Sequence, residues 1–208
     1  MRILLAVAPL LFSSCAFRTH QVGLHYPPCA ASKTHLTETS FERPVRIALG
    51  RFEDLRLDPS LIGEQRNAWM MHTAQVRSVG SVAGWLQDAL AFELEGTNFA
   101  ITALEETGTP PLLLQAEVRL VGSSRHSATT AVVEFSVKLK RGFKILWAHR
   151  YRGVASLSAE TQDQLQEQFR REIDPWGEAL ARALCVATAP LARDLHGALA
   201  EERGRVRE

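Results

Sequence analysis

The sequence has few of the residues that mark a disulfide scaffold, a charged partner or a membrane span. It holds 3 cysteines in 208 residues and no Cys-x-x-Cys pair, which excludes a disulfide-rich scaffold. No apolar run reaches the roughly 20 residues that a membrane-spanning helix needs. The charges balance, with 24 Lys and Arg against 23 Asp and Glu, so no general basic surface is available for nucleic acid.

Catalytic signatures are missing as well. The chain has no Gly-x-Ser-x-Gly turn, no His-Glu-x-x-His pair and no glycine-rich phosphate loop after a predicted strand. His126, His149 and the Glu105–Glu106 pair are isolated in predicted turns and strands. General acid-base catalysis needs a second titratable group within hydrogen-bond reach, and the sequence pattern supplies none. We therefore expect no enzymatic activity, no cofactor and no metal site.

The first fifteen residues have the pattern of an export leader. Arg2 supplies one positive charge, and residues 3–12 are apolar with a single proline. Two small residues, Ser13 and Ser14, then precede Cys15. A short charged segment followed by a short apolar segment is typical of a secretory leader and is too short for a membrane anchor.

The segment Leu11 to Cys15 resembles a bacterial lipobox, although Phe12 stands where that motif usually has Leu, Val or Ile. The resemblance implies that residues 1–14 are a lipoprotein signal peptide. It also implies that Cys15 is the lipidation site, so that acyl chains anchor the protein to a membrane. Ala16, where an Asp would favour the inner membrane, points to the periplasmic face of the outer membrane.

Residues 15–43 are predicted to be a flexible tether. They have no period of 2 or 3.6 residues and contain the Pro27–Pro28 pair, as extended linkers do. Cys29 lies in this segment, and Cys185 lies on an apolar helical stripe near the other end of the chain. An oxidising periplasm would allow these two thiols to pair, but Cys185 is equally suited to a buried free thiol. The sequence leaves both alternatives open.

Residues 44–202 are predicted to form one domain, followed by a charged tail at 203–208. Alternating apolar residues predict strands, and apolar residues at helical spacing predict helices. The strands are expected near 45–49, 99–103, 114–120, 133–139 and 143–147, and the helices at 82–94 and after Asp174–Pro175. These elements predict an α+β fold: a two-layer sandwich with a mostly antiparallel sheet of about 4–5 strands and helices packed on one face. We expect its core to bury Trp85, Leu90, Val118, Phe135 and Leu184 together.

The segment from Phe52 to Arg56, with Leu61-Ile62-Gly63 after it, is similar to the YajG-like family of bacterial outer-membrane lipoproteins. The resemblance extends roughly from 45 to 195 and implies a small envelope lipoprotein of unsettled activity. On physical grounds, Asp54 and Arg56 are placed to brace the following loop by a charge-assisted hydrogen bond. Gly63 is able to take a backbone angle that other residues avoid.

Residues 53–78 are predicted to be a long connection, and such connections are usually functional or disordered. This one contains Trp69, Met70 and Met71 beside polar residues. One alternative is that the triplet folds back and caps the core, as large apolar residues usually do. The other is that it stays exposed as a partner-binding loop, since Trp and Met are enriched at recognition surfaces.

The sequence thus predicts a lipid-anchored, non-catalytic, periplasm-facing lipoprotein that binds another envelope component. Its expected partners are the membrane, through the acyl chains, and an envelope protein, with no nucleic acid. The alternative is an accessory lipoprotein of an ABC-type or lipopolysaccharide/phospholipid transport system. That alternative rests on a fold-level analogy with other small lipoproteins.

Overall fold

The computed structural model describes residues 18–26, 29, 44–67, 69–95, 97–102, 112–161, 163–164 and 174–205. The predicted signal peptide and Cys15 lie outside the described residues, as do most of the predicted tether and residues 206–208 of the predicted tail. The strands are β1 (Arg18–Val22), β2 (Val45–Asp54), β3 (Leu61–Arg66), β4 (His72–Ser78), β5 (Phe99–Thr102), β6 (Leu112–Arg125), β7 (Ala128–Arg141) and β8 (Lys144–Ser158). The helices are α1 (Val82–Glu95), α3 (Pro175–Thr188) and α4 (Leu191–Arg205).

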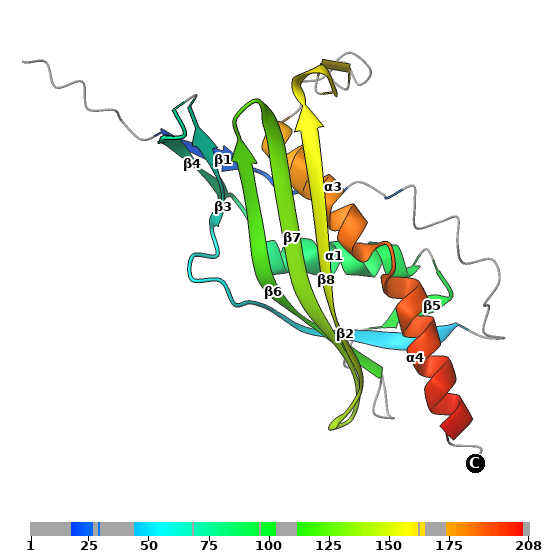
Figure 1. The fold of residues 1–208 in the computed structure, drawn as a ribbon. Coiled ribbons are helices and arrows are strands. Elements are labelled where there is room, and N and C mark those ends of the chain that lie inside the picture. The colour runs from blue at the N-terminus through cyan, green and yellow to red at the C-terminus, as the bar shows by residue number, and fades with distance from the viewer. Residues whose placement is uncertain are drawn as a thin grey trace, which may run out of the picture.

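All eight strands belong to one mixed sheet that forks at β6 (Figure 1). On one side of β6 lie β7 and β8, both antiparallel, which form the predicted meander. On the other side, β2 runs parallel to the first half of β6, and β3 runs parallel to its end. Beyond β2 lies β5, and beyond β3 lie β4 and then β1. The two branches give the sheet a wide end formed by β1, β3 and β4.

The predicted sheet of 4–5 mostly antiparallel strands is wrong, because the sheet has eight strands and mixes parallel with antiparallel pairs. The missing strands come from segments whose sequence is mostly polar. Residues 53–78, predicted as a long connection, contain the β3–β4 hairpin. Among the described residues of that hairpin, only Ile62, Ala74 and Val76 are buried, so its alternating pattern is weak. The parallel β2–β5 pair follows from a crossover, since the long connection between these two strands, which includes α1, returns the chain to the start of β2.

Helices α1 and α3 cover the same face of the sheet (Figure 1), where α1 packs on β2, β5 and β6, and α3 packs on β6, β7 and β8. The Ser81 hydroxyl accepts a hydrogen bond from the Gly84 amide at the start of α1. At the start of α3, the Asp174 carboxylate caps two backbone amides, and proline occupies the first turn as predicted. Pro190 separates α3 from α4, because a proline cannot continue the helix without losing a hydrogen bond.

The predicted core is confirmed. Trp85, Leu90, Val118, Phe135 and Leu184 are all buried in one cluster between the two helices and the sheet. The helix α3 approaches β8 closely, since a side chain at Gly153 would clash with the α3 backbone. The glycine therefore lets α3 pack directly on the strand.

The segment predicted as a flexible tether is partly built into the domain, which corrects that prediction for residues 18–26 and 29. Residues 18–22 form the edge strand β1, in parallel register with β4. Cys29 is joined by a disulfide to Cys185 on α3, with a Cα–Cα distance of 5.6 Å. The structure thus selects the disulfide, one of the two alternatives that the sequence left open.

Tyr26 lies beside this disulfide and joins the N-terminal segment to both covering helices. Its hydroxyl donates to Oε1 of Glu93 on α1 at 2.6 Å and lies 3.2 Å from the Thr188 hydroxyl on α3. Burial, together with the Glu93 carboxylate, raises the pKa of the Tyr26 phenol well above its usual value, so the hydroxyl keeps its proton and donates. The disulfide and this phenol fix the N-terminal segment across the helical layer.

Candidate functional site

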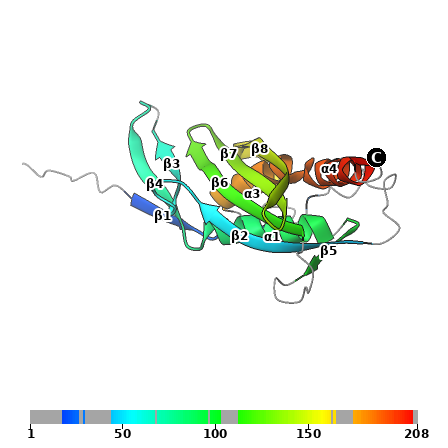
Figure 2. The same cartoon turned by 90° about the horizontal axis from the view of Figure 1, so that it is seen from below.

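Among the described residues, no helix covers the face of the sheet opposite α1 and α3 near β6 and β7 (Figure 2). On β7, Thr129, Ala131 and Val133 are buried on the helix side, whereas Thr130 and Val132 alternate with them and point to the open face. Ser124 pairs with Thr130, so its side chain shares that open face.

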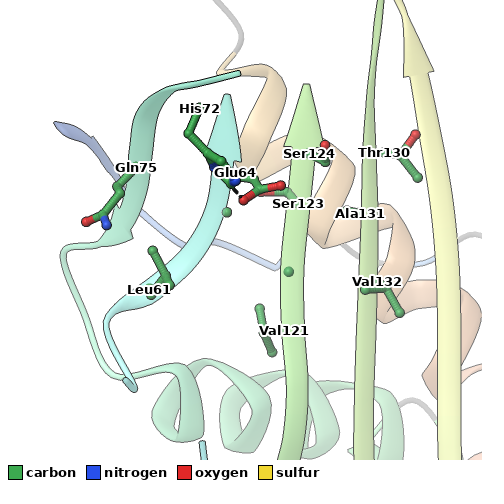
Figure 3. Close-up of a pocket in the computed structure, with 12 residues that line it drawn as sticks. Leu61, Glu64, His72, Gln75, Val121, Ser123, Ser124, Thr130, Ala131 and Val132 are labelled. Carbon is green, nitrogen blue, oxygen red and sulfur yellow. Dashed lines mark ion pairs between the residues drawn. The ribbon is translucent and has the colours of Figure 1, made fainter. Parts of the chain in front are cut away.

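A hollow of about 590 Å³ lies on this open face between the β3–β4 hairpin and strands β6 and β7 (Figure 3). Its volume falls within the range of small-molecule sites. Most of its lining is apolar or carries a hydroxyl group. The lining residues are Leu61, Gly63, Glu64, His72, Gln75, Val121, Gly122, Ser123, Ser124, Thr130, Ala131 and Val132.

The charged rim of the hollow comes from the hairpin. Glu64 receives a hydrogen bond from Nε of Arg66 at 2.5 Å, and its other oxygen lies 2.9 Å from Nδ1 of His72 (Figure 3). The Arg66 and His72 side chains are both partly exposed, so water screens their interactions with Glu64. The hollow therefore combines an apolar floor with a polar rim, as sites that bind amphipathic molecules do.

Two hydroxyl groups of the hollow lie close to groups other than His72. Ser123 is buried and donates to the Ile62 carbonyl oxygen at 2.8 Å. Thr130 lies 3.5 Å from the Ser156 hydroxyl. In the described ranges, no hydrogen bond joins either hydroxyl to His72, the base that an activated nucleophile in this hollow would need within reach.

Asp54 and Arg56 lie at the fork, where β2 ends and β3 begins, and form a buried bidentate ion pair. Nε of Arg56 donates to Asp54 Oδ1 at 2.9 Å, and a terminal guanidinium nitrogen donates to Oδ2 at 2.6 Å. The other terminal nitrogen donates to the carbonyl oxygens of Leu61 and Val121, at 2.8 and 3.4 Å. Since both of those residues line the hollow, this ion pair holds one of its walls.

Gly63 has a structural role different from the predicted one. Its backbone angle is not in the left-handed region, so the expectation of an unusual angle is wrong. What requires glycine is space, because a Cβ at this position would lie 2.1 Å from the Ser123 hydroxyl oxygen and 2.7 Å from the Ser123 carbonyl oxygen. The missing side chain lets β3 pair closely with β6 below the hollow.

Trp69, Met70 and Met71 form the tip of the β3–β4 hairpin and project into solvent. Their exposed fractions are 80%, 56% and 58%, so they do not cap the core. The Asn67 side chain holds the turn by accepting hydrogen bonds from the Trp69 and Met71 amides, and Met70 takes a left-handed backbone angle, φ 62°. Partner binding by this triplet stays a prediction.

Sequence reasoning did not find the residues of the hollow. Glu64 and His72 are eight positions apart and meet because the hairpin lays β3 beside β4, where Glu64 pairs with Gln75 and Arg66 pairs with His72. Thr130 and Val132 reach the same hollow from a distant strand. A hairpin assignment for 61–78 would have placed Glu64 near His72, but pairing with β6 is long-range and leaves no local signal.

Within the described part of the chain, no three His, Cys, Asp or Glu side chains gather as metal ligands. Among those same residues, no helix is both long and apolar enough to cross a membrane.

Comparison with known proteins identifies similar folds. No protein-family model matches the chain, and no curated protein matches it. The crystal structure of protein XCC0632 from Xanthomonas campestris, a DUF330 protein, is similar to this chain with a TM-score of 0.55 and 13% identity. That match covers 90% of this chain and 99% of the other. A second structure, of an uncharacterized protein, matches with a TM-score of 0.47 and 10% identity over 86% of this chain and 99% of its own. At this identity, the first likeness shows the fold alone.

Proposed function

We propose that the chain is a lipid-anchored, non-catalytic lipoprotein of the bacterial outer membrane that faces the periplasm and binds another envelope component. The observation that carries the binding function is the hollow of about 590 Å³ on the open face of the sheet. It is apolar below and polar at the rim, and one wall is held by the buried Asp54–Arg56 pair. A preformed site of this kind binds its ligand without the entropy cost of ordering a loop.

Two further features support an envelope location. The Leu11–Cys15 segment resembles a lipobox, and membership of the YajG-like family remains part of the proposal. The Cys29–Cys185 disulfide supports an oxidising compartment, because such bonds persist in the periplasm and are rare in the cytosol.

The anchor is tested with Cys15→Ser in cells fed a labelled fatty acid. We expect wild-type protein to incorporate the label and to sediment with outer membranes, and Cys15→Ser to lose both properties. A wild-type protein without label would contradict lipidation.

The binding site is tested by photocrosslinking in cells. A photoreactive residue in place of Thr130, which lines the hollow, should give a discrete crosslinked product. The same residue in place of Val186, which is exposed on α3 at the helical face, is the control and should give none. Equal crosslinking from both positions would remove the hollow as the binding site.

A second candidate function is that of an accessory lipoprotein in an ABC-type or lipopolysaccharide/phospholipid transport system that handles lipid directly. The apolar floor of the hollow favours this candidate. Mass spectrometry of protein extracted in mild detergent should then find lipid bound to wild type and lost from Val132→Asp. Val154→Asp is a matched control, since Val154 is exposed on β8 beside the hollow and does not line it. A stable protein complex without lipid would favour the first function.

A further inference from the structure

The proposed lipid anchor lies very close to the folded domain. Strand β1 begins at Arg18, three residues after Cys15. Three residues span at most about 10 Å, however they run. If Cys15 holds acyl chains in a bilayer, as the proposed function requires, the start of β1 must lie within about 10 Å of the membrane surface. The part of the domain that surrounds Arg18 is called here the anchor end.

The Trp69-Met70-Met71 tip belongs to the anchor end. Arg18 pairs with Ala74 in parallel register, and β4 begins two residues earlier at His72, directly after the triplet. Met71 is thus three residues from Ala74, about 10 Å along the strand. Both views of the molecule show the start of β1 and the β3–β4 hairpin at the same extremity of the sheet (Figures 1 and 2).

The tip has the composition and the backbone pairing that contact with a bilayer requires. Tryptophan concentrates at the boundary between lipid headgroups and acyl chains, and methionine is flexible and apolar. The turn also pairs several of its own backbone groups. The Asn67 side-chain oxygen accepts hydrogen bonds from the Trp69 and Met71 amides, and the Asn67 backbone amide donates to the Met71 carbonyl oxygen. The Met70 amide donates to the Asn67 carbonyl oxygen. Polar backbone groups that are paired internally can leave water without an uncompensated cost.

The charges around the tip do not oppose this contact. Arg66 is paired with Glu64, whereas in the described ranges neither Arg18 nor Arg125, which pairs in register with Gln65, has an ion pair with a carboxylate. The anchor end therefore carries a small positive charge from these two arginines. With so small a charge, apolar insertion rather than attraction to anionic lipid has to supply the contact.

We propose that Trp69, Met70 and Met71 insert into the same bilayer that holds the acyl chains on Cys15. The domain then touches the membrane at two places, so its orientation is fixed instead of varying about a single anchor. His72 and Gln75 follow the tip on the same strand and line the hollow, which therefore opens close to the membrane surface.

The test uses the lipidated full-length mature protein in phosphatidylethanolamine/phosphatidylglycerol vesicles, with and without bromine on the acyl chains. Bromine quenches tryptophan emission only near the hydrocarbon. Of the 4 tryptophans, Trp85 and Trp176 are buried in the core, so bromine should not quench their emission, which serves as the internal reference. We expect brominated vesicles to remove about a quarter of the wild-type emission, the share of one tryptophan in four. Trp69→Phe should lose that quenching.

Two further variants sharpen the result. Replacing Met70 and Met71 by Ser keeps Trp69 as the reporter and should reduce its quenching at least two-fold. Phe143→Ser is the matched control, since Phe143 is fully exposed at the β7–β8 turn, at the opposite end of the 14-residue strand β7. This control should be quenched like wild type, and unchanged melting temperatures should show that every variant is folded.

The outcomes separate this inference from the proposed function. Lipidated protein that stays on the vesicles with equal quenching in wild type and Trp69→Phe overturns the membrane contact and leaves the anchor intact. A photoreactive residue at Met70 that captures a protein while Trp69 is unquenched assigns the tip to a protein partner, which also overturns the inference. Protein that carries no fatty acid and leaves the vesicles overturns the proposed function and this inference together.

Discussion

Replacing Gly153 by Ala should destabilise the domain strongly, because α3 rests on the strand at that point. The new Cβ would lie 1.9 Å from the Ala183 carbonyl oxygen and 2.7 Å from the Ala187 amide nitrogen. Both are backbone atoms of a regular helix, so α3 has to retreat by about 1 Å. A gap of that size forfeits a quarter to a half of the dispersion attraction of the atoms that it separates.

Overpacking a core lowers the free energy of unfolding by about 1–3 kcal/mol. Because a whole helix has to move, we expect Gly153→Ala to lie near the upper limit, about 3 kcal/mol. For a chain of this size each kcal/mol lowers the melting temperature by about 2–4 °C, so a fall of about 6–12 °C is expected. Circular dichroism during heating, with the disulfide kept oxidised, measures it.

Gly122→Ala is the control, since its Cβ would meet only Val132 Cγ1 at an ordinary 3.8 Å. We expect that variant to melt like wild type or slightly higher, because alanine lowers the entropy of the unfolded chain. If Gly153→Ala melts within about 2 °C of Gly122→Ala, the direct seating of α3 on β8 is refuted.

Two other predictions concern the core and the response to acid. Leu90→Ala should lower the free energy of unfolding by about 2–5 kcal/mol, because the Leu90 side chain is fully buried between α1 and the sheet. An unchanged midpoint of urea unfolding would contradict the helix-on-sheet packing. Burial lowers the pKa of His196 in the folded domain. Below about pH 6.5, the unfolded chain therefore binds a proton at this histidine more readily than the folded domain does. Stability should therefore fall on acidification from pH 7 to 5, and His196→Phe should make that fall shallower in urea titrations; an identical slope in both proteins would count against it.

The elements that could be predicted from the sequence are those with a strong local period. The stripe of α1, the strands of the meander and the Asp174 cap are each specified by residues close together in the chain. Even there, a bulge between Val118 and Leu120 shifts the alternation, so Leu120 is partly exposed although its pattern predicted burial.

The elements that could not be predicted depend on distant partners. Strand β1 has one buried residue, Val22, and gains its place only by pairing with β4. The hollow forms where the β3–β4 hairpin, the fork of the sheet and two strands of the meander lie side by side. No periodicity in the sequence predicts these long-range contacts. The Asp54–Arg56 brace was anticipated because its two residues are neighbours in sequence, whereas its acceptors on Leu61 and Val121 were not.

The Cys29–Cys185 bond has a mechanical consequence if the protein is anchored at Cys15, as proposed above. Tension on the anchor acts first on β1, a short edge strand that can be peeled from its neighbour. With the bond intact, only residues 18–28 can be drawn out, about 35–40 Å of chain, before the load passes through the sulfur atoms into α3. Without the disulfide, the chain could be drawn out as far as the start of β2, a length of about 90 Å. The force would then act on β2, in the middle of the sheet. The disulfide thus limits how much of the N-terminal chain tension can pull out of the domain.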